Sequence, residues 1–191
     1  MQITEIRTDE TLRELRAHGT PEFPFEYYYD DFNKFSGQSI AWHWHREFEF
    51  VAVDAGPIDC LIGAERLRME IGSGLFINSG AIHRFESTAQ GRMPNILFAP
   101  EFLAERDSLV FRQHILPVLN AGCRFIPLTR GTDAGDAVLH RLRRIFETAQ
   151  SDSPLRTLDL KAESCALWSA LAAHAGERFC ETRSAENAVL Q

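Results

Sequence analysis

The sequence predicts a mainly β protein, in which a sandwich or barrel of short strands is followed by a small helical part. Three observations lead to this prediction. Between residues 23 and 100 the chain is rich in aromatic and β-branched residues and is divided into short runs by Gly, Pro, Asn and Asp. From residue 101 onward the apolar residues recur at helical spacing instead. Strands and helices are thus segregated along the chain, which argues against the alternating units of a parallel sheet.

Composition narrows the functional class. The chain has 191 residues, of which 45% are hydrophobic and 25% charged, as in an ordinary globular protein of one domain or slightly more. The net charge of −7 argues against a chain that by itself binds nucleic acid or an anionic membrane. The first residues contain no secretory signal, no apolar run is long enough to span a membrane, and the four cysteines form no CxxC pair. We therefore expect a cytoplasmic protein with reduced thiols and no membrane partner.

The strand-rich part is preceded by an N-terminal arm. Residues 1–22 are expected to form this arm, with a short helix around residues 10–17. The barrel is expected over residues 23–100, because short β-type runs alternate there with Gly-containing turns. The expected strands are residues 23–32, 39–45, 48–55, 58–63, 67–71, 75–78, 83–87 and 95–100.

The helical part is expected over residues 101–178. Its first helix should span residues 104–116 and end near Pro117, because proline interrupts a helix. The last residues, 179–191, are expected to be a linker.

Two longer helices should follow. Residues 133–149 carry an apolar stripe at helical spacing and begin at a cap formed by Thr132 or Asp133. Residues 157–175 show similar spacing, and Gly176 follows as a C-cap.

Two histidines lie two residues apart in the stretch AWHWHREFEF, residues 41–50. Successive side chains of a strand point to opposite faces, so His43 and His45 point to the same face. If the chain turns directly after them, Glu49 opens the next strand beside them, and one hairpin can deliver two imidazoles and a carboxylate into the barrel. His83 begins a later strand and is a fourth candidate. In this arrangement the second strand of the hairpin points inward with Glu49, Val51 and Val53 and outward with Phe48 and Phe50.

The spacing around these residues resembles the two cupin motifs. From Gly37 to Gly56 the sequence matches the first motif at every fixed position. The second motif is matched less fully, because Asn78 stands where a proline is usual and Ser87 where an asparagine is usual. These departures leave the ligand positions intact and weaken only the inference about the turn and the surroundings of the ligands. The resemblance implies a cupin jelly-roll barrel, with metal ligands at His43, His45, Glu49 and His83.

Three imidazoles and one carboxylate suit several divalent metal ions, namely Zn, Ni, Fe, Mn or Cu. The implied cofactor is therefore a divalent metal ion whose identity stays open. An octahedral ion held by four side chains keeps two positions for water or for a bidentate small molecule. Many sensory cupins keep the histidines without demonstrable metal, so a purely polar pocket is the alternative.

The order of the segments resembles the amino-terminal sensor half of AraC-type transcriptional regulators. The resemblance rests on the stretches HWHREFEF, GLFINSGAIHRF, LFAPEFL and FRQHILPVL and covers residues 23–178. It implies a small-molecule effector in the barrel and a homodimer formed through the helical subdomain. It also implies DNA binding through a C-terminal half with two helix-turn-helix units, which this chain does not contain. We expect either an excised piece of such a regulator or a natural stand-alone sensor, and the uncapped end SAENAVLQ favours the former.

Effector contacts are expected from side chains that point into the barrel. The candidates are Tyr27, Tyr29, Trp42 and Asn78, although the sequence does not tell which way each one points. The acidic residues 30–31 lie next to a turn and are expected to be solvated, so no convincing acid/base pair is expected near the histidines.

Two other functions remain as alternatives. A metal-dependent cupin enzyme, such as a dioxygenase, isomerase or epimerase, would use the same ligands with substrate in the open positions. A sugar- or metabolite-binding module without metal would keep the regulatory role. The helical tail, which a cupin enzyme of this length does not need, favours the sensor. The sequence also shows no phosphate loop, serine elbow or Cys–His nucleophile pair.

Overall fold

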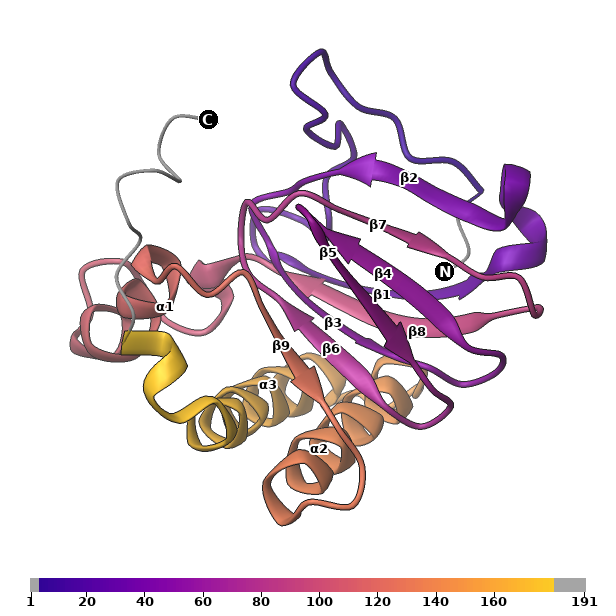
Figure 1. Ribbon diagram of the computed structural model, residues 1–191. Helices are drawn as coiled ribbons and strands as arrows, with labels where there is room; N and C mark the ends of the chain where they lie inside the picture. Colours follow the sequence, from indigo (N-terminus) through magenta and orange to yellow (C-terminus); the bar gives the residue numbers. More distant parts are fainter. Residues whose placement is uncertain (1–3, 181–191) are drawn as a thin grey trace.

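The computed structural model describes residues 4–180 and contains two antiparallel β-sheets that face each other (Figure 1). One sheet has five strands in the order β1-β8-β3-β6-β9, and the other has four in the order β2-β7-β4-β5. Most neighbours within a sheet are distant in the sequence, as in a jelly-roll barrel. The fold class is mainly β with a helical C-terminal part, which confirms the prediction. Residues 181–191 of the expected linker lie outside the described residues.

The bounds of the elements follow the chain order. The strands are β1 (Phe25–Asp31), β2 (Ser39–His43), β3 (Phe48–Ala52), β4 (Ile58–Ile62), β5 (Glu65–Met69), β6 (Gly74–Ile77), β7 (His83–Glu86), β8 (Arg92–Phe98) and β9 (Phe125–Leu128). The α-helices are α1 (Leu116–Asn120), α2 (Asp133–Ala149) and α3 (Arg156–Ala175). The short 3-10 turns are η1 (Phe32–Lys34), η2 (Ser36–Gln38), η3 (Pro100–Phe102) and η5 (Gly176–Cys180), and η4 (Phe111–Ile115) is a π-helical segment.

All eight predicted strands are present with slightly shifted ends, and β9 is an addition that the sequence did not predict. β9 lies within the part expected to be helical, yet it pairs with β6 along its whole length, from Ile77 opposite Phe125 to Gly74 opposite Leu128. Its four residues, FIPL, are too few to show a period, and this is why the strand was missed.

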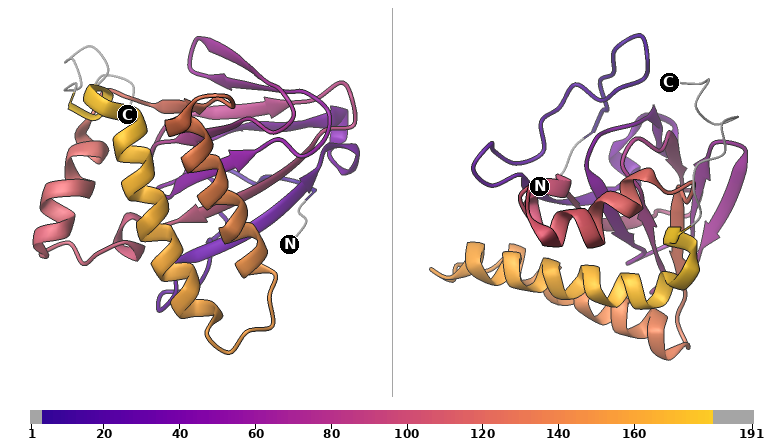
Figure 2. Two further views of the ribbon diagram at one scale, coloured as in Figure 1. Left: turned by 90° about the horizontal axis from the view of Figure 1, so that it is seen from below. Right: turned by 90° about the vertical axis from the view of Figure 1, so that its left-hand side faces the viewer.

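The two long helices agree with their predictions. α2 begins after Thr132, whose hydroxyl accepts a hydrogen bond from the Gly135 N–H at 3.1 Å. α3 ends before Gly176, which has a positive φ of 55°. Figure 2 shows α2 and α3 side by side, against the outer face of the five-stranded sheet.

The helix predicted for residues 104–116 is wrong in both bounds. The helical segment begins near Leu109, passes through the π-helical residues of η4 and continues as α1 to Asn120. Pro117 does not end it, and lies at the start of α1, directly after the π-helical residues.

The helix predicted in the arm is also wrong. The carboxylate of Asp9 accepts hydrogen bonds from the N–H groups of Thr11 and Arg13, at 2.8 and 3.1 Å. Such local bonds compete with helix formation. The following residues extend along the end of β2 instead, where Glu14 N–H donates to the carbonyl oxygen of Trp44 at 2.9 Å.

Two apolar clusters fill the protein. The first lies between the five-stranded sheet and the helices, and Phe48 and Phe50 of β3 point into it, as predicted for the outward face of this strand. Trp168 of α3 packs on Phe48 with ring centroids 4.6 Å apart. The second cluster fills the space between the sheets and includes Tyr28, Ile40, Val51, Val53, Cys60, Phe85, Met93 and Leu97.

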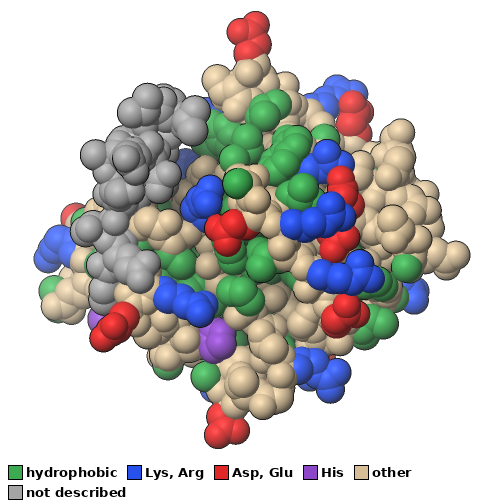
Figure 3. All heavy atoms as spheres, viewed as in Figure 1, with side chains coloured by type: hydrophobic (Ala, Val, Ile, Leu, Met, Phe, Trp, Pro, Cys, Tyr) green, Lys and Arg blue, Asp and Glu red, His purple; other side chains and the backbone are tan. Residues whose placement is uncertain are grey.

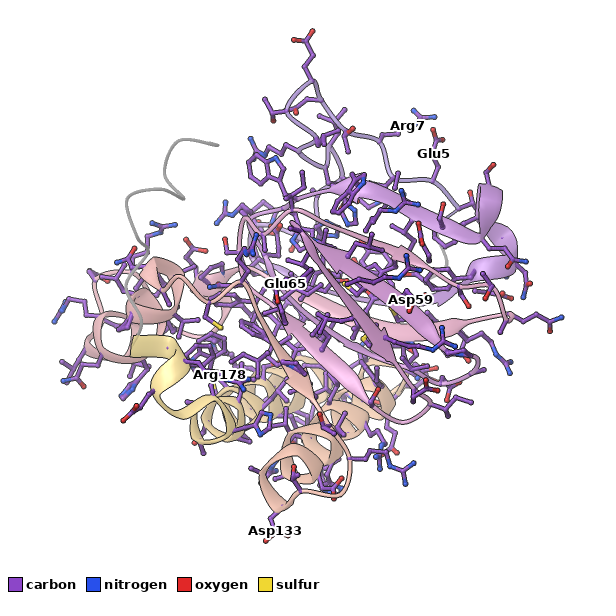
Figure 4. The ribbon with its side chains drawn as sticks, viewed as in Figure 1. Glu5, Arg7, Asp59, Glu65, Asp133 and Arg178 are labelled. Atoms are coloured by element: carbon purple, nitrogen blue, oxygen red, sulfur yellow. The ribbon has the colours of Figure 1, made fainter. Side chains whose placement is uncertain are left out.

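The surface carries mixed charge on the face that Figure 3 shows, where Lys and Arg side chains are interspersed with Asp and Glu. Figure 4 places Glu5 and Arg7 of the arm at one end of the molecule and Asp133, the first residue of α2, at the other end. Among the described residues, no helix has the length and apolar character needed to cross a membrane.

Candidate metal centre

Three strands and the loop between β2 and β3, which carries His45, bring the predicted ligands together inside the barrel. His43 ends β2 and stands opposite His83, the first residue of β7. Ile40 and His43 of β2 lie an odd number of residues apart, so a regular strand would point them to opposite faces. A register irregularity between them turns the side chains of Ile40 and His43 both toward the interior. Glu49 comes from β3 in the opposite sheet, so the site bridges the two sheets.

The distances suit one metal ion. Ligand nitrogens of His43, His45 and His83 all lie within 4.8 Å of one another. Glu49 does not belong to that set of three, but its Oε2 lies 3.3 Å from His45 Nε2 and 3.0 Å from His83 Nε2. His83 is fully buried, and its Nε2 has no hydrogen-bond partner, because its contact with Glu49 is close but not aligned for a hydrogen bond. A buried nitrogen without a partner is costly unless something binds it.

Backbone carbonyls fix which nitrogen of each ring is free. Nδ1 of His43 donates to Ala41 O and Nδ1 of His83 donates to Ala81 O, both at 2.8 Å. Because Nδ1 carries the proton, Nε2 of a neutral ring keeps its lone pair for a metal ion.

Electrostatics favour ligand-ready protonation states. Burial lowers the pKa of His43 well below its usual value, and the neighbouring rings of His83 and His45 lower it further, so His43 is neutral at neutral pH. Burial alone would raise the pKa of Glu49, but the contacts with His45 and His83 outweigh burial and lower it below its usual range. The site thus presents the neutral imidazole of His43 and the ionised carboxylate of Glu49, forms that bind metal ions.

A second group of buried polar side chains lies beside these ligands. The arm inserts Glu14 and His18 into the barrel, where His18 Nε2 lies 3.3 Å from Glu14 Oε2 and His18 Nδ1 lies 2.9 Å from the Tyr28 hydroxyl. The other oxygen of Glu14, Oε1, is buried without a hydrogen-bond partner.

Asp30 belongs to the same group, so the expectation that it is solvated is wrong. The residue is only 3% exposed, because β1 turns its side chain toward the interior together with Tyr28. Its Oδ2 accepts a hydrogen bond from Asn95 at 2.8 Å, whereas its Oδ1 is buried without a partner. Burial raises the pKa of Asp30 from its ordinary value of 3.8 to about 7, although the bond from Asn95 acts in the other direction.

Two cavities adjoin the site. A small one of about 20 Å³, enough for a water molecule, is lined by Glu14, His18, Asp30, His43 and Glu49, among others. A wide cavity of about 840 Å³ lies between the arm, the turn between β2 and β3, and the segment that follows β8. Glu14 and His18 line both cavities and therefore stand between the interior and the wide cavity.

The four side chains expected to contact an effector line neither cavity. Tyr27 packs against Phe146 of α2, on the helical side of the sheet. Tyr29 donates a hydrogen bond to Asp54. Trp42 lies beneath the guanidinium of Arg84. The remaining one, Asn78, directs its amide at the helical part, as the hydrogen bonds to Val118 and Cys123 show.

The polar residues that line the small cavity were missed for identifiable reasons. Alternation along β1 was predicted, and the structure shows that Tyr28 and Asp30 are the inward set. Nothing in the sequence sets the phase of that alternation. Glu14 and His18 carried no signal, because they reach the barrel from an irregular arm.

Comparison with known proteins gives a consistent result. The model of the family described as the AraC-like ligand binding domain matches residues 31–167, which is more than half of the chain. A curated relative, an uncharacterised HTH-type transcriptional regulator, YdeC, of Bacillus subtilis, is 25% identical over 163 residues. The match covers 84% of this chain and 55% of the relative, so the chain spans about half the length of that protein.

Two solved structures are similar to less than half of this chain. A conserved protein of unknown function from Streptococcus pyogenes matches 40% of this chain and 64% of its own, with 21% identity and a TM-score of 0.35. A predicted oxalate decarboxylase from Thermotoga maritima matches 32% of this chain and 56% of its own, with 22% identity and a TM-score of 0.30. At these scores the likeness carries no argument about function.

Proposed function

Because the chain belongs to the family of AraC-like ligand-binding domains, we propose that it is the effector-sensing and dimerisation part of an AraC-type regulator and that its sensing site holds one divalent metal ion. The single observation that carries the metal proposal is the convergence of His43, His45, His83 and Glu49 on one buried point. The partnerless Nε2 of His83 supports it, since a metal ion would satisfy that nitrogen.

The ion would be Zn, Ni, Fe or Mn, because all four accept imidazole and carboxylate ligands. When bound, it supplies positive charge and open coordination positions for an oxygen or nitrogen atom of the effector. The protein side of the site orients the rings through Ala41 O and Ala81 O and excludes bulk water by burial.

The effector would contact the polar side chains beside the metal ligands. Glu14 Oε1 and Asp30 Oδ1 are buried and have no hydrogen-bond partner. An effector that donates hydrogen bonds to them would remove the free-energy cost of leaving these oxygens unpaired. The wide cavity offers room for the rest of a small molecule, and Glu14 and His18 lie on the way from it to the interior. We place the effector contacts at these residues, in preference to the four expected from the sequence.

The regulator as a whole would act as a cytoplasmic homodimer. The curated relative is a transcriptional regulator, and this chain matches about half of it. DNA contacts would therefore belong to a helix-turn-helix half outside the matched part, in keeping with the net charge of −7 of this chain.

The metal proposal is tested by replacing His83 with Ala and measuring metal content. This change removes one ligand and leaves His43 and His45 in place. We expect one divalent ion per wild-type chain and clearly less in the variant, with the β-type circular dichroism spectrum kept. The matched control is His140→Ala, which removes an exposed histidine of α2 and should leave the metal content unchanged. Equal metal content in all three proteins, purified without a His-tag or chelator, would show that the site is only a polar pocket.

A metal-dependent cupin enzyme is the second candidate, and one observation favours it. Asp30 is a buried carboxyl beside the ligands with a pKa of about 7, which suits a general acid or base at neutral pH. Asp30 is thus an acid/base group near the site, which the sequence did not lead us to expect. Steady turnover of a cupin-type substrate by the metal-loaded chain, lost in Asp30→Asn, would replace the sensor proposal with the enzyme.

A further inference from the structure

The turn between β6 and β7, residues 78–81, touches the metal ligands on one side and the helical part on the other. We infer that this turn, through Asn78, couples occupancy of the metal centre to the helices that follow the barrel. The inference rests on the proposed metal function and concerns how the state of that site reaches the rest of the chain.

On the side of the metal centre, the 78–81 turn holds two of the ligands. The N–H of Gly80 donates to the carbonyl oxygen of His45 at 2.8 Å, and the carbonyl of Ala81 accepts from Nδ1 of His83 at 2.8 Å. An ion that binds Nε2 of both histidines fixes their rings relative to each other. The turn between them is then held in one position.

On the helical side, both polar atoms of the Asn78 side chain are hydrogen-bonded. Nδ2 donates to Val118 O at 2.8 Å and to Cys123 O at 2.9 Å, while Oδ1 accepts from the N–H of Ser79 at 2.8 Å. Its backbone N–H donates to Arg124 O at 2.8 Å. Asn78 is only 3% exposed, so these bonds are shielded from competing water. A shift of the turn therefore moves α1 and the segment leading to β9, or else breaks buried hydrogen bonds.

A hydrogen bond also links the helical segment that contains α1 to α3. The π-helical segment η4 precedes α1 without interruption, and its His114 carbonyl accepts a hydrogen bond from Trp168 Nε1 at 3.0 Å. Trp168 belongs to α3 and packs on Phe48. Asn78 thus connects the metal centre with α3, the longest helix among the described residues.

The residue type at position 78 fits this role. The second cupin motif usually has a proline there, and a proline has neither a backbone N–H nor a side-chain donor. It could make none of the three hydrogen bonds that Asn78 donates to residues 118, 123 and 124. The departure from the motif is therefore explained by attachment of the turn to the helices.

The test is hydrogen–deuterium exchange of the full chain, with and without one equivalent of zinc ions, in wild type and in Asn78→Ala. In wild type, zinc should slow exchange around the ligands and also over residues 116–125, there by about tenfold, or about 1.4 kcal/mol of local opening free energy. In Asn78→Ala, zinc should still bind at one equivalent and protect the ligand strands, but the protection of residues 116–125 should be lost. A purely structural role of Asn78 would raise exchange there equally with and without zinc.

The matched control is Ser79→Ala. It removes a hydrogen bond of the same turn, from Ser79 Oγ to Arg46 O at 2.7 Å, without touching the helical contacts, and should behave as wild type. If Asn78→Ala does not fold, Asn78→Asp keeps the acceptor oxygen, loses both amide donors and carries the same expectation. Zinc that binds to wild type without protecting residues 116–125 refutes the coupling, as does protection that persists in the Asn78 variants. If wild type binds no zinc, the metal proposal itself fails and the coupling falls with it.

Discussion

Replacing Asp30 with Asn should stabilise the metal-free protein at neutral and alkaline pH and leave its stability nearly unchanged at acid pH. The reason is the raised pKa of this buried carboxyl, about 7 in the folded protein against an ordinary value of 3.8. Below pH 4 or so, both the folded and the unfolded chain keep the proton on Asp30 and no difference arises. Between the two pKa values the unfolded chain releases the proton while the folded chain holds it, so the free energy of unfolding falls as pH rises.

The size of the effect follows from the pKa difference. About three pKa units at roughly 1.4 kcal/mol each give about 4 kcal/mol as an upper value, and relaxation around the charge reduces it to an expected ~2–4 kcal/mol above pH 7. Asparagine has nearly the same shape and keeps an oxygen that accepts the bond from Asn95. The variant therefore removes the cost of the buried charge with little loss of packing.

Urea unfolding of both proteins between pH 4 and pH 8, in the presence of a chelator, measures the difference. The chelator matters because a bound cation would lower the pKa of Asp30 and conceal the effect. The other titratable groups are common to both proteins, so their contributions cancel in the difference. A free-energy difference between variant and wild type that stays constant across the pH range would refute the reasoning.

Three further predictions concern the core, the assembly and the DNA contacts. Leu142→Ala truncates a fully buried side chain of α2 and should lower the free energy of unfolding by about 2–5 kcal/mol, measured by urea titration; a change near zero would mean that the site collapses without a cavity. Gel filtration with light scattering should give a dimer at micromolar concentration, and Leu158→Glu should weaken it, because the exposed Leu155 and Leu158 at the start of α3 offer an apolar surface; a strict monomer in wild type would contradict this. Gel shifts should show no salt-resistant, sequence-specific complex of this chain with promoter DNA, and a sharp complex would overturn the assignment of DNA binding to another half.

The sequence predicted the barrel well because alternation and turn residues are local signals. The strands that carry His43, Glu49 and His83 were placed correctly, and so was the inward direction of Glu49 and Val51. When these strands pair as observed, the positions of the three residues along the sequence bring their side chains together.

What could not be predicted depends on contacts between distant segments. The sequence shows that tyrosines alternate along β1, but only packing against Phe146 decides that Tyr27 faces the helices and Tyr28 the interior. Asp30 was expected to be solvated because it lies beside a turn, but its side chain is buried in the sheet in which β1 pairs with β8. Glu14 enters the barrel from an irregular arm, for which no periodic pattern exists.

Strand β9 has a consequence for anyone who wishes to produce the barrel by itself. It returns to the five-stranded sheet after the helical residues 109–120 and covers the edge of β6 from Gly74 to Ile77. A fragment that ends at residue 100 would leave that edge with free N–H and C=O groups and would expose the apolar face around Phe48 and Phe76 to water. An open edge beside an apolar face is a template for pairing between molecules. Such a fragment should collect in inclusion bodies, whereas a chain that extends through α3 carries its own cover.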